Sequence, residues 1–178
     1  MPDLPVPLRP HPAHPCDAVQ QVSFDAVRDA AGLALQYVVR GDLSRLSLPT
    51  GSGRTRRDEL WKHTCFEVFL GKDGAEDYLE FNFAPDGDWA AYTFRGYRNG
   101  GSALDCAPPQ IETTVSEDRL TISVRVPALP SEFASGQIRL GPSAIVETQD
   151  GTLSYWALHQ PPEAPDFHTP NNFQISLD

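Results

Sequence analysis

The sequence predicts an all-β protein: an antiparallel β-sandwich of jelly-roll type, with about ten strands in a single domain. Apolar and polar residues alternate along most of the chain, as in strands with one buried face. Turn signals such as Asp86-Gly87, Glu117-Asp118 and Asp150-Gly151 separate these segments. No window carries a sustained helical stripe, and the 178 residues suit one core better than two.

The first 17 residues are expected to form an arm that precedes the sandwich at 18–178. Six prolines lie within residues 1–15. Proline removes a backbone donor, so this arm should not pair as a central strand and should lie loose or drape over the fold. The start of the chain has no charged segment followed by an apolar run, which argues against a signal peptide and predicts a cytoplasmic protein.

The period-two segments follow one another from residue 19 onward. Most end at a Gly, Pro or Asp-Gly signal, and three neighbouring pairs are expected to form hairpins. In chain order the predicted strands are 19–27, 33–39, 61–70, 78–83, 89–95, 111–115, 120–126, 138–147, 153–158 and 173–177.

Charge and cysteine usage exclude several function classes. The 14 Lys and Arg residues against 24 Asp and Glu give a net charge of -10, which disfavours nucleic acid and anionic membranes as partners. No segment is apolar over a membrane-spanning length. Cys16, Cys65 and Cys106 lie far apart without a Cys-x-x-Cys pair, so neither a disulfide framework nor a zinc site is expected.

The predicted strand 61–70 has an unusual outward face. Side chains alternate across a strand, so Phe66, Val68 and Leu70 should face the core. Trp61, His63 and Glu67 then share the opposite face. An indole, an imidazole and a carboxylate in one row are suited to binding a polar ligand.

The next two predicted strands extend this face. Tyr78, Glu80 and Asn82 alternate with apolar residues, and Glu67 is expected opposite Glu80 or Asn82. In 89–95, Trp89 and Arg95 share one parity, with Tyr92 and Phe94 on the other. We expect Arg95 to donate to the carboxylates and the tryptophans to stack on a ring, as sugar binding requires. The alternative is that the polar groups only satisfy one another beneath a loop.

The C-terminal part offers further candidates. Tyr155 and His159 have the parity opposite to Trp156, which is expected in the core. Within the proline-rich segment 161–168, Asp166 is expected to form an Asx-turn with Phe167 as a plug. The functional alternative has His159, Asp166 and His168 closing over the site.

Catalysis is not expected. Glu67 and Glu80 at about 5 Å would match a retaining glycosidase. A neighbouring Arg95 should hold both carboxylates ionised and so remove the raised pKa that a general acid needs. The chain also has no Gly-x-Ser-x-Gly, phosphate-loop or His-Glu-x-x-His motif.

Two runs carry a family resemblance: Leu-Trp-Lys-His-Thr-Cys-Phe-Glu-Val-Phe-Leu at 60–70 and Tyr-Leu-Glu-Phe-Asn-Phe-Ala-Pro-Asp-Gly at 78–87. Together with 153–159 and 165–168 they resemble the bacterial DOMON-like domains, which are similar to family 9 carbohydrate-binding modules. The resemblance spans about 19–177. It implies an antiparallel β-sandwich that binds sugar or haem without catalysis.

We therefore predict a non-catalytic module that binds a carbohydrate-like small molecule, without a cofactor. One alternative is haem or metal binding, although Met1 is the only methionine and a bis-histidine site would need two of His63, His159 and His168 to face each other. Another is a protein-interaction scaffold without a small ligand. The predicted ligand-binding residues are Trp61, His63, Glu67, Tyr78, Glu80, Asn82, Trp89, Arg95, His159 and His168.

Overall fold

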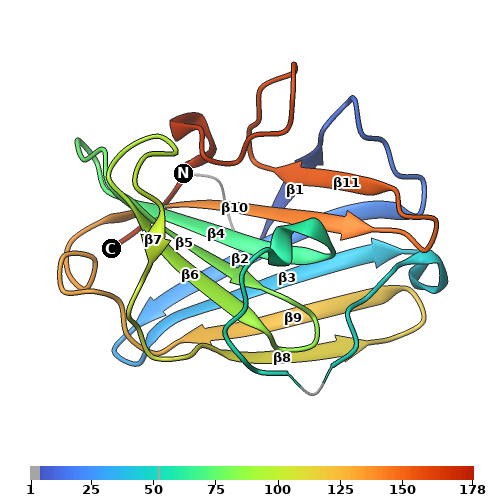
Figure 1. Ribbon diagram of the computed structural model, residues 1–178, viewed down its shortest axis with the longest axis horizontal. Helices are drawn as coiled ribbons and strands as arrows, with labels where there is room; N and C mark the ends of the chain where they lie inside the picture. Colours follow the sequence, from blue (N-terminus) through green and yellow to red (C-terminus); the bar gives the residue numbers. More distant parts are fainter. Residues whose placement is uncertain (1–4, 52) are drawn as a thin grey trace.

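The computed structural model describes residues 5–51 and 53–178, and these form an all-β fold (Figure 1). Every strand pair is antiparallel, which confirms the predicted fold class. The described residues contain three short 3-10 helices and no α-helix, and none of these helices is long and apolar enough to cross a membrane. Met1 lies outside the described residues, and the jelly-roll description stays a prediction.

The strands follow the predicted segments closely, with β1 and β7 in addition. They are β1 (Val6–Pro10), β2 (Val19–Asp29), β3 (Gly32–Gly41), β4 (Cys65–Gly71), β5 (Tyr78–Phe83), β6 (Trp89–Phe94), β7 (Ser102–Ala103), β8 (Gln110–Val115), β9 (Arg119–Val126), β10 (Ile138–Glu147), β11 (Leu153–Ala157) and β12 (Ile175–Leu177). The 3-10 helices are η1 (Leu43–Arg45), η2 (Leu60–Lys62) and η3 (Pro170–Asn172).

One continuous sheet folds over itself into two layers. Its strand order is β7-β6-β5-β4-β10-β11-β1-β2-β3-β9-β8, with β12 paired to β10. One layer consists of β7, β6, β5, β4, β10 and β11, and the other consists of β2, β3, β9 and β8. Strand β1 joins the two layers, because it pairs with β11 and with β2. In Figure 1 the green β4, β5 and β6 overlap the blue β2 and β3 of the other layer. The core fills the space between, where Tyr37 of β3 contacts Phe66 of β4 with ring centroids 5.2 Å apart.

The expectation of a loose N-terminal arm is wrong for β1. Val6–Leu8 pair with β2, whereas Arg9 and Pro10 pair with β11. Each half of β1 thus bonds a different partner, so the prolines do not have to sustain a full ladder on both sides. His11, just beyond β1, is buried, and its Nε2 lies 2.9 Å from the carbonyl oxygen of Pro161. The arm is therefore part of the sandwich.

Candidate functional site: a polar cleft outside β4, β5 and β10

The two faces of β4 differ as the alternation predicts. Phe66, Val68 and Leu70 point into the core between the layers. Glu67 takes the outer face, between Cys65 and Phe69, and these two belong to smaller apolar clusters outside the sheet. All of β4 is nonetheless buried, because loops cover its outer face. Glu67 is only 3% exposed.

The strand register sets a polar row beneath this cover. Glu67 is opposite Asn82 of β5 on one side and Ser143 of β10 on the other. Asn82 Nδ2 donates to Glu80 Oε1 at 2.9 Å. Among the described residues, Asn82 Oδ1 and Ser143 Oγ have no hydrogen-bond partner although both side chains are fully buried. An unsatisfied buried polar atom is costly, so two of them beside one carboxyl distinguish this face from an ordinary apolar interior.

Burial dominates the electrostatics of the two glutamates. It raises the pKa of Glu67 well above the ordinary value, nearby Glu80 raises it further, and Arg98 opposes both effects. Burial also raises the pKa of Glu80, against the hydrogen bond from Asn82 and the charge of Arg98. The expectation that Arg95 holds both carboxylates ionised is therefore wrong.

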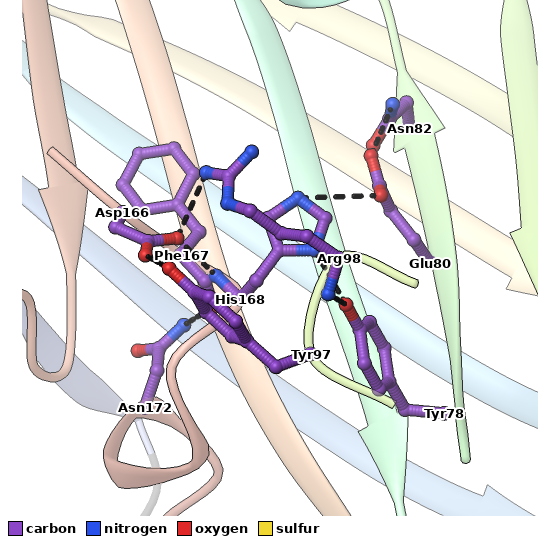
Figure 2. A network of polar contacts seen from close by, with 9 residues as sticks. All are labelled: Tyr78, Glu80, Asn82, Tyr97, Arg98, Asp166, Phe167, His168 and Asn172. Carbon is purple, nitrogen blue, oxygen red and sulfur yellow. Dashed lines mark hydrogen bonds and ion pairs between the residues drawn. The ribbon is translucent and has the colours of Figure 1, made fainter. Parts of the chain in front are cut away.

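His168 connects Glu80 to the covering loops (Figure 2). Tyr78 Oη accepts from the backbone N–H of Arg98 at 3.1 Å and lies 2.8 Å from His168 Nδ1, so the phenol proton points at that nitrogen. Burial, then the charge of Arg98, lowers the pKa of His168 to about 4 despite Asp166. The neutral ring then keeps its proton on Nε2, which lies 3.8 Å from Glu80 Oε2.

Asp166 ties two covering loops together. Its carboxylate accepts from Arg98 Nη2 at 2.9 Å and from the hydroxyl of Tyr97, both in the β6–β7 connection. It also accepts from the backbone N–H of His168 at 3.1 Å, which confirms the predicted Asx-turn. Phe167 is buried against Phe69 and its neighbours, as expected of a plug. Figure 2 shows Arg98, Asp166 and His168 close together beside Glu80.

These elements enclose a cleft of about 760 Å³ that reaches Glu67 and Glu80. Its size falls in the range of small-ligand sites. Polar and charged groups line the floor and one wall, and aromatic rings line much of the rest. The lining residues are Asp58, Glu59, Trp61, Glu67, Glu80, Tyr92, Phe94, Arg98, Gly101, Ala103, Ile145, Tyr155, Pro165, Phe167 and His168.

Trp61 and His63 do not continue the strand as predicted. Glu59 adopts a left-handed backbone conformation with φ 64°, and η2 follows it, so the period-two alternation begins only at Cys65. Trp61 reaches the rim of the cleft with half of its surface exposed. His63 lies outside the lining, and its exposed ring contacts Glu147 with Nδ1 2.9 Å from Oε2.

Trp89, Arg95 and His159 also lie away from the cleft. Trp89 is opposite Phe83 and faces the core, with the Arg56 guanidinium 5.1 Å from its ring centroid. The predicted pair of stacking tryptophans is therefore not formed. Arg95 is exposed beyond the end of β6, and His159 is exposed beyond β11. The remaining predicted residues, Glu67, Tyr78, Glu80, Asn82 and His168, are brought together in and around the cleft floor.

Several lining residues were not predicted as site residues. Tyr92 and Phe94 have the parity that was not chosen, and the Phe83–Trp89 pairing is what places them on the cleft side. Arg98 comes from a loop, where no periodicity indicates which way a side chain points. Ser143, which pairs with Glu67 but does not line the cleft, carries a signal of its own, because it is a lone hydroxyl within the apolar run of β10.

The positions of the histidine, cysteine and acidic side chains bear on the alternative of a bound metal ion or haem. The described residues contain no group of three or more His, Cys, Asp or Glu side chains able to hold a metal ion. His168 is the one histidine among the described residues that line the cleft. Two of the three candidate histidines thus stand outside it. Haem or a metal ion as a cofactor stays an untested prediction.

The chain resembles solved structures with the same fold. No protein-family model matches it, and no curated protein does. A candidate carbohydrate-binding protein of Bacteroides uniformis ATCC 8492 superposes with a TM-score of 0.61 at 14% identity, over 95% of this chain and 84% of the other. A family 9 carbohydrate-binding module of Caldicellulosiruptor kristjanssonii in complex with glucose gives 0.50 at 12%, over 86% and 71%. The cellotriose complex of such a module from that organism gives 0.51 at 13%, over 94% and 77%. At these identities the likeness establishes the fold.

Proposed function

We propose that the chain is a non-catalytic module that binds a carbohydrate-like small molecule in the cleft above Glu67. The observation that carries this proposal is the cleft itself, of about 760 Å³, which is lined by the buried carboxyl groups of Glu67 and Glu80 together with aromatic rings. A ligand hydroxyl can both donate and accept, and so can bond to these carboxyl groups in either protonation state.

The walls support the same class of ligand. Sugars present polar edges and apolar C–H faces, and the latter pack well on aromatic rings. Trp61 at the rim and Tyr92, Phe94 and Tyr155 in the walls offer such surfaces around a polar floor. The structural neighbours from Caldicellulosiruptor kristjanssonii, which were solved with glucose and cellotriose, support a sugar as the first ligand to test.

The finer DOMON-like assignment belongs to this proposal as well, since the shared fold alone does not distinguish it from other sugar-binding sandwiches. The scaffold alternative is less well supported. A purely structural polar row should be satisfied internally. Asn82 Oδ1 and Ser143 Oγ are not satisfied by any described residue.

The test measures the binding of a panel of mono- and oligosaccharides to the chain, with tryptophan fluorescence and calorimetry as the readouts. We expect glucose or a related sugar to bind and to change the emission of Trp61, which stands at the rim. Trp61→Ala should weaken binding, whereas Val115→Ala, an exposed apolar change in the other layer, should not. Silence across the whole panel would overturn sugar binding. Release of product from a glycoside by the wild type, lost in Glu67→Gln, would make the chain an enzyme instead.

A further inference from the structure

The ring of His168 lies between Tyr78 and Glu80 (Figure 2). Its Nδ1 lies 2.8 Å from Tyr78 Oη, and its Nε2 lies 3.8 Å from Glu80 Oε2. His168 and Glu80 both line the cleft, whereas Tyr78 does not. The side chains of His168 and Glu80 are 14% and 8% exposed, so both reach the cleft but are largely shielded from water. The imidazole therefore has one nitrogen bonded to the fold and the other directed toward a second group of the cleft.

Tyr78 determines which ring nitrogen of His168 carries the proton. Its Oη accepts from the backbone N–H of Arg98 at 3.1 Å. Among the described residues, His168 Nδ1 is the acceptor within hydrogen-bonding distance of the phenol proton. Burial and the charge of Arg98 lower the pKa of His168 to about 4, so the ring is neutral near pH 7. A neutral imidazole that accepts at Nδ1 has its proton on Nε2.

The contact between His168 Nε2 and Glu80 Oε2 is too long to be a hydrogen bond. The donor and acceptor of such a bond lie about 2.7–3.2 Å apart. Neither atom forms a hydrogen bond with a described residue, because Asn82 bonds the other carboxyl oxygen of Glu80, Oε1. One oxygen beside the pair can lie about 2.8 Å from both atoms. The spacing thus suits a single oxygen that bonds to both groups.

We propose, resting on the function proposed above, that His168 Nε2 and Glu80 Oε2 together bind one hydroxyl group of the sugar, and that Tyr78 is the positioning residue that directs the His168 proton at it. The hydroxyl accepts from Nε2–H and bonds to the Glu80 carboxyl, which it can do whether that carboxyl is ionised or protonated. A sugar without this hydroxyl leaves both protein groups unpaired, which is costly in a shielded site. The pair therefore selects for a hydroxyl at one position of the sugar.

Charged ligand groups fit this pair less well. An ammonium has no lone pair that could accept from Nε2–H. A carboxylate or phosphate can accept from it, but brings a negative charge beside Glu80 and Glu67, whose carboxyl groups both line the cleft. A neutral hydroxyl meets neither obstacle.

The tautomer of His168 decides whether the pair can act together. With its proton on Nδ1, the ring would present an acceptor at Nε2, and a hydroxyl could no longer accept from it. Tyr78→Phe removes the hydroxyl that favours the Nε2–H form. It keeps the ring, which stacks on Phe94 with centroids 4.8 Å apart. We therefore expect this variant to move the proton of His168 toward Nδ1.

The first experiment needs no ligand and records the nitrogen chemical shifts of His168 by NMR in the full chain near pH 7. The wild type should carry its proton on Nε2, and Tyr78→Phe should have a larger share of the Nδ1–H form. Tyr97→Phe is the matched control, because the Tyr97 hydroxyl bonds Asp166 and not the His168 ring. It should leave the tautomer unchanged. A wild-type ring that carries its proton on Nδ1 overturns the proposal.

The second experiment measures by calorimetry the binding of glucose, or of the panel sugar that binds in its place, and of its monodeoxy analogues. One analogue should bind the wild type at least about tenfold more weakly than the parent sugar, which corresponds to about 1.4 kcal/mol. His168→Gln keeps an N–H donor near the position of Nε2 and should preserve this difference. His168→Asn has no donor at that position and should remove the difference, and Tyr78→Phe should reduce it.

The outcomes separate the inference from the function on which it rests. Equal binding of the parent sugar and all its monodeoxy analogues overturns the inference and leaves the proposed function standing. A loss that persists unchanged in His168→Asn assigns that hydroxyl to another part of the cleft, and so also overturns the inference. A panel in which no sugar binds overturns both. The wild-type nitrogen shifts test the role of Tyr78 even where a variant fails to fold.

Discussion

The two faces of β4 and β5 make opposite use of burial. On the inner face, Phe66, Val68, Phe81 and their neighbours pack against the other layer and have no polar group to satisfy. On the outer face, Glu67 and Asn82 are buried almost as completely, yet the row that contains them holds polar atoms without partners. The same strands therefore supply stability from one side and a candidate binding floor from the other.

This contrast shows why burial alone does not identify a core. Every residue of β4 and β5 is buried. The outer face is covered by loops held through Asp166 rather than by a second sheet, and it keeps a cleft. A buried residue on such a face is expected to trade stability for binding, as functional sites commonly do. Substitutions on the two faces should thus differ in sign as well as in size.

The largest effect should come from the inner face. Phe81→Ala removes a fully buried ring between the layers and should lower the free energy of unfolding by about 3–5 kcal/mol through lost burial and the resulting cavity. Urea titration followed by circular dichroism measures this change. A loss below about 1 kcal/mol would contradict the assignment of this face as the main core.

The sequence predicted the two faces of the regular strands better than it predicted the segments beside them. Alternation located β4 and β5 and their two faces, because a period of two determines the side of each residue once one is known. It failed for Trp61 and His63, since the residues Trp-Lys-His-Thr are as compatible with a strand as with the 3-10 turn that Glu59 starts. Trp89 was misplaced because the choice of parity in β6 required the pairing with Phe83.

The loops and the first strand were the least predictable. Arg98 and Asp166 meet across 68 positions of sequence, and no local pattern encodes that contact. The prolines of β1 argue against a strand on local grounds. The structure tolerates them because β1 divides its pairing between β2 and β11, which only the tertiary arrangement reveals.

The next effect is a pH dependence of the stability, which arises from Glu67 on the outer face. The folded pKa of Glu67 is raised above its ordinary value of 4.5, so the folded protein holds a proton that the unfolded chain gives up. The stability from Glu67 is therefore fully present below about pH 4.5 and is lost as the pH rises toward the folded pKa, by about 1.4 kcal/mol per pH unit. Relative to the wild type, Glu67→Gln should gain stability over that range.

Urea titrations of both proteins at a series of pH values measure this difference. His168 acts in the opposite direction: its pKa falls to about 4 in the folded state, so its contribution is lost as the pH falls from 6.5 toward 4. His168 contributes to the free energy of unfolding of both proteins. Its contribution therefore cancels when the free energy of the wild type is subtracted from that of Glu67→Gln at each pH. A difference that does not change with pH would rule out a protonated Glu67.

A smaller loss of stability is expected from the ion pair that holds the covering loops together. Arg98→Ala removes the ion pair with Asp166 and should cost about 0.5–1 kcal/mol, because the guanidinium is half exposed. Backbone amides of 161–170 should then exchange faster with deuterium. Arg95→Ala is the matched control, since this exposed arginine lies outside the cleft, and it should change neither quantity. Equal exchange in both variants would show that the Asp166 contacts do not hold the cover.

The smallest change in stability should come from substitution of Ser143, the serine of the polar row. Ser154 provides a close comparison. Ser154 and Ser143 are both fully buried, but Ser154 Oγ accepts from Trp156 Nε1 at 3.0 Å. Ser154→Ala leaves the Trp156 indole N–H without an acceptor and should lower the free energy of unfolding by about 1–3 kcal/mol. Ser143 Oγ has no partner among the described residues, so Ser143→Ala should be neutral or slightly stabilising. Thermal unfolding of both variants measures the two changes in stability. Equal destabilisation by both alanines would mean that the floor is an ordinary, satisfied interior.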